Sequence, residues 1–223
     1  MIVIIPARLE STRLMNKMLI EIEGKPLIRK VRDDIMDLGY DAYVATDSEE
    51  IAKAVKGGLV LRTSQYPNGT LRAMAAAKAI GEDKFILVQG DCVGLSKHTL
   101  ESIEAMLYDN AGDLDAVTAV KKFRSKNEMM LPSKVKTIHN GNRMMWNTRQ
   151  NIGYGDHHVG VYGFNNLDIA QACVGDTIED LEQNEWLLKG FKVGVVSTTD
   201  NIFDINTEDD VREVLQRGTS TIG

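Results

Sequence analysis

The stretch Met1-Ile-Val-Ile-Ile-Pro-Ala7 opens the chain, and the polar loop Arg8-Leu-Glu-Ser-Thr-Arg-Leu-Met-Asn-Lys17 follows it at once. A short apolar run that is rich in β-branched residues and stopped by charges is typical of a strand buried on both faces. After the loop, Pro26 suits the first turn of a helix, which we expect to run to about Leu38 and to end at Gly39. The order strand, loop, helix predicts the first unit of an α/β fold.

The same alternation continues to about residue 120. The pattern predicts further strands at residues 41–45, 59–62, 85–89 and 115–120, and helices that begin near Asp47 and span 70–80 and 96–108. Strands that alternate with helices along a chain pair in parallel, and the helices cover both faces of the sheet. We therefore expect a mostly parallel sheet.

Between residues 121 and 164 the pattern changes to two short strands around the turn Asn140-Gly141, which is typical of an antiparallel hairpin. Beyond it we expect a helix from Thr177 to about Leu188, a strand at 192–197 and a last helix that starts at Thr207. We read residues 1–223 as a single domain with an insertion subdomain at about 121–164.

The bulk composition narrows the function classes. A net charge of -6 on 223 residues argues against general binding to nucleic acid or to a membrane surface, so an anionic substrate needs a local basic patch. No apolar run is long enough for a membrane span or a signal-peptide core. Cys92 and Cys173 are too few for a disulfide scaffold and too isolated for a zinc cluster, so we predict a cytoplasmic protein.

The loop after the first strand supplies such a basic patch. It crowds Arg8, Arg13 and Lys17 together with two hydroxyl residues, Ser11 and Thr12. Guanidinium groups bind phosphate oxygens bidentately and lysine adds a mobile charge, so the loop is a candidate cradle for a triphosphate. A solvated basic loop is the alternative, and both remain open. The chain has neither G-x-G-x-x-G after the first strand nor G-x-x-x-x-G-K-[ST], which argues against a dinucleotide oxidoreductase and a P-loop NTPase.

Two aspartates are candidates for binding a metal ion. Asp91 follows Gln89-Gly90 at the predicted tip of a strand, where ligands of parallel sheets bind, and Asp204 precedes the last predicted helix. If the two segments lie side by side, both carboxylates can share a hard cation such as Mg²⁺. A turn or helix-capping aspartate is the alternative for Asp91.

A third group lies on one predicted strand, where His158, Gly160, Tyr162 and Phe164 share a face. Histidine and tyrosine on such a face suit the hydroxyl groups of a sugar, whereas a hydrogen-bonded core histidine is the alternative. Motifs of serine hydrolases and zinc hydrolases are absent.

Taken together, these segments match one family in order and spacing over nearly the whole chain. The matching segments are Ile4-Ile-Pro-Ala-Arg8, Ser11-Thr-Arg-Leu14, Lys17, Gly24-Lys-Pro26, Val44-Ala-Thr-Asp47, Asn68-Gly-Thr70, Val88-Gln-Gly-Asp91, His158-Val-Gly-Val-Tyr-Gly163, Leu181-Glu-Gln183 and Asp204-Ile-Asn-Thr-Glu-Asp209. The sequence resembles the 3-deoxy-manno-octulosonate (Kdo) cytidylyltransferases and, more distantly, CMP-sialic acid synthetase.

The resemblance implies a Rossmann-like nucleotide-diphospho-sugar transferase fold and an enzyme that joins CMP from CTP to an acidic Kdo-like sugar, with release of pyrophosphate and Mg²⁺ as cofactor. It implies phosphate binding by Arg8, Ser11, Arg13 and Lys17, and cytosine recognition by Asn68, Gly69 and Thr70. It places Gln89, His158, Tyr162 and Glu182 at the sugar, and it makes Asp91 a metal ligand that acts in catalysis with Arg8, Arg13 and Lys17.

The chain also departs from the pattern of this family. Met15-Asn16, Cys92-Val93 and Leu71 replace family residues, and Asn206 stands where the family has a second metal-binding aspartate. An asparagine keeps a carbonyl oxygen but loses a full charge, so we expect Asp204 to take over beside Asn206. Two alternatives stay open: a nucleotidyltransferase of the same fold with another sugar or triphosphate, and a catalytically silent relative that binds a nucleotide.

The predicted insertion is rich in large apolar side chains, namely Met129, Met130, Leu131, Met144, Met145 and Trp146. Such residues suit a subunit interface, and a small local core is the alternative. In the resembled family this region helps to form a dimer, so we expect a homodimer.

Overall fold

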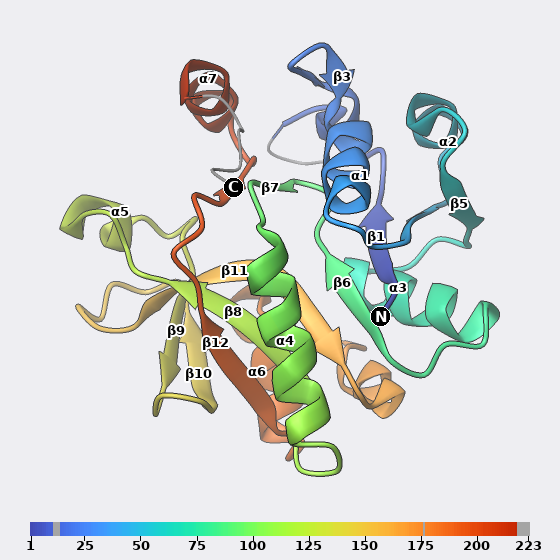
Figure 1. Ribbon diagram of the computed structural model, residues 1–223. Helices are drawn as coiled ribbons and strands as arrows, with labels where there is room; N and C mark the ends of the chain where they lie inside the picture. Colours follow the sequence, from blue (N-terminus) through green and yellow to red (C-terminus); the bar gives the residue numbers. More distant parts are fainter. Residues whose placement is uncertain (11–13, 176, 218–223) are drawn as a thin grey trace. The chain divides into compact units, whose positions relative to one another are not determined.

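The computed structural model describes residues 1–10, 14–175 and 177–217. The chain forms two compact units (Figure 1). Unit 1 comprises Met1–Lys97 with Asp200–Gly223, and unit 2 comprises His98–Thr199. The C-terminal segment therefore returns to the unit in which the chain begins.

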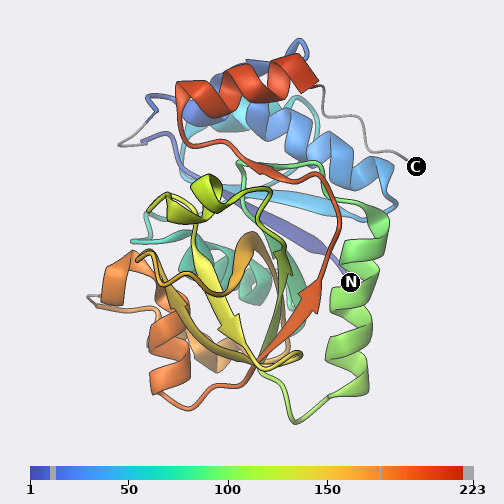
Figure 2. The same cartoon turned by 90° about the vertical axis from the view of Figure 1, so that its left-hand side faces the viewer.

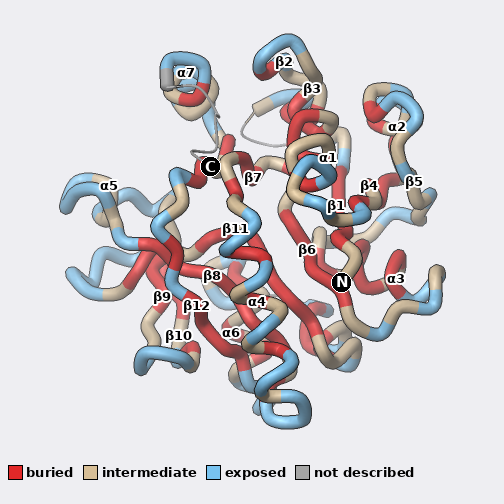
Figure 3. Tube along the Cα trace, viewed as in Figure 1, coloured by how far each residue is buried: buried red, intermediate tan, exposed pale blue. Residues whose placement is uncertain are grey.

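Unit 1 contains a parallel sheet of strands that the sequence predicts, whereas the strand predicted at residues 115–120 is β8 (Ala116–Lys121) and belongs to unit 2. Within unit 1 the strands lie in the order β6-β1-β4-β5, and their bounds are Phe85–Val88, Val3–Ala7, Ala42–Thr46 and Leu59–Arg62. Every residue of β1 and β6 is buried, as the red traces of both strands show (Figure 3). Both faces of these strands are thus covered, which explains their unbroken apolar sequences.

Helices connect the strands of unit 1 where the sequence places start and stop signals. The helix α1 (Leu27–Asp37) follows Pro26 and ends before Gly39, whose φ of 93° suits glycine at the end of a helix. The helices α2 and α3 have the bounds Glu49–Val55 and Gly69–Ala79. Their caps are Ser48 and Asn68, whose side chains accept hydrogen bonds from backbone N–H groups of the first turn.

Two short antiparallel pairs complete unit 1. The strand β2 (Glu21–Ile22) pairs with β3 (Lys25–Pro26), and β7 (Cys92–Val93) pairs with β13 (Phe203–Asp204). The β7–β13 pair joins the loop after β6 to the segment that leads into α7 (Glu208–Arg217). At the start of α7, the N–H of Thr207 donates to the carboxylate of Asp210, and the N–H of Asp210 donates to Thr207 Oγ1. These two bonds form the predicted capping box.

Unit 2 has a mixed sheet with the strand order β12-β8-β11-β9-β10 (Figures 1 and 2). The strand bounds are Val193–Ser197, Ala116–Lys121, Asp156–Phe164, Lys136–His139 and Met144–Thr148. Only β12 and β8 run parallel, and the other neighbours are antiparallel. The turn predicted at Asn140-Gly141 joins β9 to β10, and the N–H of Asn140 donates to the carbonyl of Arg143.

Helices cover both faces of β11. A Cβ atom on Gly163 would lie 2.6 Å or less from Ile103 and Leu107 of α4 (Lys97–Asp109), so glycine lets this helix pack closely. Tyr162 and Phe164 point the other way, and both rings contact Trp186 of α6 (Glu182–Leu188). The remaining short helices of unit 2 are α5 (Lys126–Met130), η2 (Leu167–Ala172) and η3 (Ile178–Asp180).

The prediction of one continuous helix from Thr177 to about Leu188 is wrong, because the structure has two separate helices there. The short helix η3 ends at Asp180, and α6 starts only at Glu182. Glu179 and Asp180 have φ values of 57° and 55°, which no continuous α-helix contains. No helix of the described residues is long and apolar enough to cross a membrane.

Candidate active site

The basic loop after β1 is described in part. Arg8 follows β1 and is exposed, whereas the predicted phosphate ligands Ser11 and Arg13 lie outside the described residues. At the far end of the loop, Lys17 opens the short helix η1 (Lys17–Leu19) and is buried. The preceding residue, Asn16, has the left-handed conformation (φ 49°) that asparagine tolerates better than most residues. This turn at Asn16 precedes the buried Lys17.

The Lys17 side chain contacts the residues that follow the end of β6. After β6, Gln89 and Gly90 lead to Asp91, as predicted, and the N–H of Ile205 donates to the carbonyl of Asp91 at 3.0 Å. A Cβ atom on Gly90 would lie 3.0 Å from the sulfur of Met18, so glycine allows η1 to approach the strand tip. The sequence-based expectation that the segments of Asp91 and Asp204 lie side by side is confirmed by the β7–β13 pair, in which Asp204 lies opposite Cys92.

Three side chains from distant parts of unit 1 meet at this point. The Lys17 ammonium forms an ion pair with the Asp91 carboxylate, and Lys17 Nζ donates to Asn206 Oδ1 at 3.2 Å. Only 11% of the Lys17 side chain and 16% of the Asp91 side chain are exposed. We call Lys17, Asp91 and Asn206 the cation cluster, since two oxygen atoms converge there on one positive charge.

The donor set of the cation cluster suits Mg²⁺. A carboxylate and an amide carbonyl are hard oxygen ligands, and Mg²⁺ is usually held by one or two carboxylates together with substrate phosphates. Within residues 1–10, 14–175 and 177–217, no three His, Cys, Asp or Glu side chains form a group that could hold a metal ion by themselves. A metal ion at Asp91 would therefore need further ligands from a substrate or water.

The predicted base-recognition segment lies at the start of α3. Asn68 Oδ1 accepts from the N–H of Leu71 at 2.8 Å, and Thr70 is buried. A Cβ atom on Gly69 would lie 3.2 Å from both Gln89 Oε1 and Pro6 Cγ, so this glycine packs against β1 and the residue after β6. Unit 1 thus brings the predicted residues Gly69 and Gln89 together.

Sequence reasoning gave no role to Arg72, which braces this region. Its guanidinium lies 2.9 Å from the Asp47 carboxylate and 2.7 Å from Thr63 Oγ1, and only 3% of the residue is exposed. Asp47 follows β4 and Thr63 follows β5, so Arg72 joins the ends of two strands to α3. An arginine near the start of an otherwise alanine-rich helix is the sequence signal that could have identified this role.

In unit 2, the predicted sugar-binding residues His158 and Tyr162 are neighbours. Their ring centroids are 5.3 Å apart, and the Tyr162 ring stacks on Phe164 at 6.0 Å. A β-bulge lies between Val159 and Tyr162, so the strand does not alternate regularly as expected. His158 and Tyr162 still meet, which agrees with the predicted shared face.

The protonation state of His158 follows from its surroundings. Burial, with a smaller effect from the positive charge of Arg149, lowers the pKa of His158 to about 4, so the ring is neutral near pH 7. Thr118 donates its hydroxyl proton to the carbonyl of Val161 at 2.8 Å and lies 3.2 Å from His158 Nε2. His158 Nε2–H therefore donates to Thr118, which leaves Nδ1 as a hydrogen-bond acceptor.

The first turn of α6 faces the same tyrosine. Gln183 Nε2 donates to the Tyr162 hydroxyl, and the predicted sugar ligand Glu182 is the preceding residue. Asn184 is fully buried, and its side chain accepts from the N–H and donates to the carbonyl of Asn147, both at 2.9 Å. The sequence motif Leu181-Glu-Gln183 contained Gln183, but only its contact with Tyr162 marks it as a site residue.

A second set of contacts fixes the break before α6. The Glu179 carboxylate accepts from Thr148 Oγ1 at 2.9 Å and from the N–H of Arg149, while Arg149 Nε donates to the Glu179 carbonyl. The buried Lys136 ammonium donates to the carbonyls of Leu131 and Arg149, and burial lowers its pKa. We call Glu179, Lys136, Thr148 and Arg149 the latch, because these contacts hold a left-handed turn of non-glycine residues in place.

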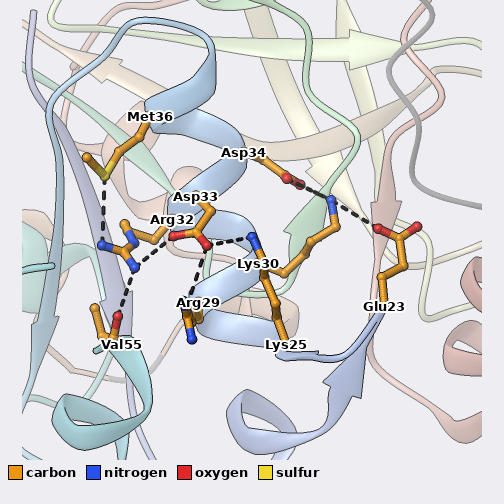
Figure 4. Close-up of polar contacts among 9 residues, drawn as sticks. All are labelled: Glu23, Lys25, Arg29, Lys30, Arg32, Asp33, Asp34, Met36 and Val55. Carbon is orange, nitrogen blue, oxygen red and sulfur yellow. Dashed lines mark hydrogen bonds and ion pairs between the residues drawn. The ribbon is translucent and has the colours of Figure 1, made fainter. Parts of the chain in front are cut away.

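Another charged cluster of unit 1 lies along α1. Asp33 interacts with Lys25 (2.8 Å), Arg29 (3.6 Å) and Arg32 (2.7 Å), and Arg32 also donates to the carbonyl of Val55 at the end of α2 (Figure 4). Lys30 adds pairs with Asp34 and Glu23. This α1 cluster contains none of the predicted site residues, and its contacts stabilise the helix and its packing on α2.

Unit 2 also contains a pocket outside the predicted sugar site. Its walls include Phe123, Met129 and Tyr154, with Lys122, His139 and Asp156 as polar groups. Asp156 accepts from Lys122 Nζ at 2.8 Å and lies 3.1 Å from His139 Nε2. All these residues belong to the predicted insertion.

Comparison with known proteins finds relatives over most of the chain. The model of the cytidylyltransferase family matches residues 2–193. The chain is 32% identical to a 3-deoxy-manno-octulosonate cytidylyltransferase of Parabacteroides distasonis and 31% identical to one of Chlorobaculum parvum, over 95% and 96% of this chain and 95% of each relative.

Two solved structures share the fold. One is the structure of CMP:2-keto-3-deoxy-manno-octonic acid synthetase complexed with CTP, which is 24% identical and has a TM-score of 0.85 over 97% of both chains. The other is the inositol-1-phosphate CTP transferase from T. maritima, which is 15% identical with a TM-score of 0.72 over 98% of this chain and 97% of that one. The Rossmann-like nucleotidyltransferase fold predicted from the sequence is thus confirmed.

Proposed function

Because the chain belongs to the cytidylyltransferase family, and its relatives include 3-deoxy-manno-octulosonate cytidylyltransferases, we propose that this enzyme joins CMP from CTP to a Kdo-like 3-deoxy-2-ulosonic acid. The observation that carries this proposal is the cation cluster at the carboxyl end of the parallel sheet, where Lys17, Asp91 and Asn206 bring both signs of charge together. Nucleotides bind at this edge of open α/β sheets.

The proposed reaction is a single displacement. The oxygen of the anomeric hydroxyl forms a bond to the α-phosphorus of CTP, and the bond from that phosphorus to the bridging oxygen of the β-phosphate breaks. Pyrophosphate leaves, and the hydroxyl proton passes to water. Such reactions depend on positioning and charge neutralisation, so no covalent bond to the enzyme is needed.

In unit 1 we assign the triphosphate to the basic loop. Arg8 and Lys17 would neutralise the departing pyrophosphate, and Ser11 and Arg13 remain predicted phosphate ligands. The cytosine is assigned to Asn68, Gly69 and Thr70 at the start of α3, beside Gln89. Binding by named side chains at fixed positions supplies the orientation that an in-line attack needs.

Mg²⁺ is the proposed cofactor. Asp91 would hold it, with Asn206 and Asp204 as further oxygen ligands. Mg²⁺ at this place would neutralise phosphate charge and lower the pKa of the attacking hydroxyl. The support for this assignment is the convergence of hard oxygens described above.

In unit 2 we assign the sugar acid to the surroundings of Tyr162. Neutral His158 offers Nδ1 as an acceptor for a sugar hydroxyl, and Gln183 and Glu182 extend the set of polar groups from α6. The Phe164 ring is fully buried and packs against Tyr162, so it would hold this tyrosine in position without contacting the sugar.

Pyrophosphate release from each of the four triphosphates with a panel of sugar acids tests the proposal. We expect turnover only with CTP, Mg²⁺ and a Kdo-like acid. Preference for another triphosphate or sugar would instead indicate a nucleotidyltransferase of the same fold with a different substrate. Binding of CTP without turnover on any sugar acid would identify a catalytically silent relative.

We also propose that the enzyme is a cytoplasmic homodimer that associates through unit 2. Met130, Leu131 and Met145 are exposed, as the sequence suggested, and exposed Tyr154 borders the pocket, whereas Met144 is buried. Exposed apolar side chains on neighbouring segments suit a subunit interface. Sedimentation equilibrium should give twice the mass of one chain, and Met145→Glu should shift it toward the monomer. A monomeric mass of the wild type at micromolar concentration would contradict this part.

A further inference from the structure

The cation cluster contains its own cation. We infer that the Lys17 ammonium occupies the metal position of Asp91 and Asn206 as long as no nucleotide is bound, so that Lys17 and a divalent cation exclude each other. This inference deepens the proposed function and rests on it for the identity of the nucleotide. It assigns Lys17 a second role besides binding phosphate.

The geometry supports mutual exclusion. Lys17 Nζ is within hydrogen-bond distance of both Asp91 Oδ2 and Asn206 Oδ1, the two oxygens that would hold a metal ion. Both charged side chains are largely shielded from water, so like charges near these oxygens repel each other more strongly than they would in solvent. An ion that binds Asp91 must therefore displace the ammonium.

The charges of the cation cluster balance one another when no metal ion or nucleotide is bound. Asp91 contributes one negative charge, Lys17 contributes one positive charge, and Asn206 contributes none. The Lys17–Asp91 pair is neutral without a metal, so Asp91 paired in this way offers a divalent cation no net attraction. An aspartate at position 206 would leave one negative charge unbalanced, so Asn206 is the residue that lets Lys17 close the site alone.

A triphosphate would change this balance. It brings several negative charges to the basic loop, and a lysine side chain is flexible enough to move its ammonium from Asp91 to a phosphate oxygen. Asp91 and Asn206 would then be open to the metal ion that arrives with the nucleotide. Metal ion and CTP should therefore strengthen each other's binding, and this coupling is reciprocal.

The decisive experiment measures Mn²⁺ affinity without any nucleotide, by electron paramagnetic resonance. Lys17→Met should bind Mn²⁺ at least tenfold more tightly than the wild type, because the competing charge is gone. The control is Lys25→Met, which removes a lysine from the α1 cluster and should leave Mn²⁺ affinity unchanged. Equal Mn²⁺ affinities of Lys17→Met and the wild type would overturn the inference.

A second variant guards against misfolding of Lys17→Met. Lys17→Gln keeps a hydrogen-bond donor for Asp91 without the charge, and the same gain in Mn²⁺ affinity is expected. Because no nucleotide is present, this comparison holds even if CTP proves not to be the substrate. CTP binding is measured separately, and its absence would sink the proposed function alone.

Discussion

The cation cluster and the α1 cluster, both in unit 1, differ in how the chain builds them. The cation cluster joins residues that are 74 and 189 positions apart, namely Lys17 with Asp91 and Lys17 with Asn206. In the α1 cluster, Asp33 pairs with Lys25 at a separation of only eight residues and with its own helix neighbours Arg29 and Arg32. The first cluster exists only in the folded unit, whereas the second forms largely from adjacent turns of chain.

We relate the cation cluster to function and the α1 cluster to the local stability of the helix. Charge pairs between neighbours on a helix contribute a few tenths of a kcal/mol and are tolerant of loss. Burial does not distinguish the clusters, because the side chains of the Arg32–Asp33 pair are 7% and 19% exposed and those of the Lys17–Asp91 pair are 11% and 16% exposed. The cation cluster differs because distant segments assemble it. Such a cluster with convergent oxygens is more informative about a binding site than the larger number of contacts along α1.

Matched removal of one aspartate from each cluster gives the largest expected contrast. Asp91→Asn should lower kcat/KM by about 10³-fold, the loss typical of removing a group that stabilises charge in a transition state. Asp33→Asn should keep kcat/KM within about twofold, since the pairs that it weakens all lie within the α1 cluster, which contains no predicted site residue. Steady-state pyrophosphate release measures both, with circular dichroism as the check on folding. Comparable losses in the two variants would erase the distinction.

Within the cation cluster, Asn206 and Asp204 can be ranked. Asn206→Ala should lower kcat/KM by about 10- to 100-fold, as expected for a residue that orients a metal ligand. Asp204 lies beside Cys92 in the β7–β13 pair, so we expect a smaller loss from Asp204→Ala. The sequence analysis predicts the reverse order, because Asp204 carries a full negative charge and Asn206 does not. Kinetic titration with Mg²⁺ decides, and a larger loss in Asp204→Ala would restore the order based on charge.

The same contrast can be tested in unit 2. Glu179→Ala opens the latch before α6 and should raise the KM for the sugar acid about tenfold, because a slight displacement of positioning groups costs one to two orders of magnitude. The KM for CTP should stay unchanged. Glu208→Ala, which loses a local pair with Arg212 on α7, is the control. If Glu179→Ala raised both KM values equally, the latch would serve general stability instead.

The smallest expected effect concerns stability in acid. The pKa of His158 is lowered to about 4 and that of His157 to about 2, mainly by burial, so the unfolded chain binds more protons than the folded one below pH 6.5. Stability should therefore fall as the pH drops from about 6.5, by about 1 kcal/mol per histidine between pH 6 and pH 5.

His158→Gln should remove its share of this loss and leave that of His157. Urea unfolding at pH 7, 6 and 5 measures the effect as a change in slope. An identical pH dependence of His158→Gln and the wild type would show that His158 is not held neutral in the folded state.

Local patterns predicted the elements of unit 1 well. The apolar run of β1 and Pro26 before α1 each act within a few residues, so their effect can be predicted without the fold. The break before α6 escaped prediction, because Thr177 and Asp180 resemble a helix start. The latch overrides this signal with contacts from β9 and β10.

The sequence by itself determined the parallel α/β layout, the antiparallel hairpin at Asn140-Gly141 and the family, because strand periodicity, caps and ordered motifs are local properties. Only the tertiary structure decided that Lys17 pairs with Asp91, that Asn206 joins them, and that Gln183 reaches Tyr162. Contacts between distant segments depend on how strands pair and helices pack, and the spacing of residues along a chain does not specify such distances.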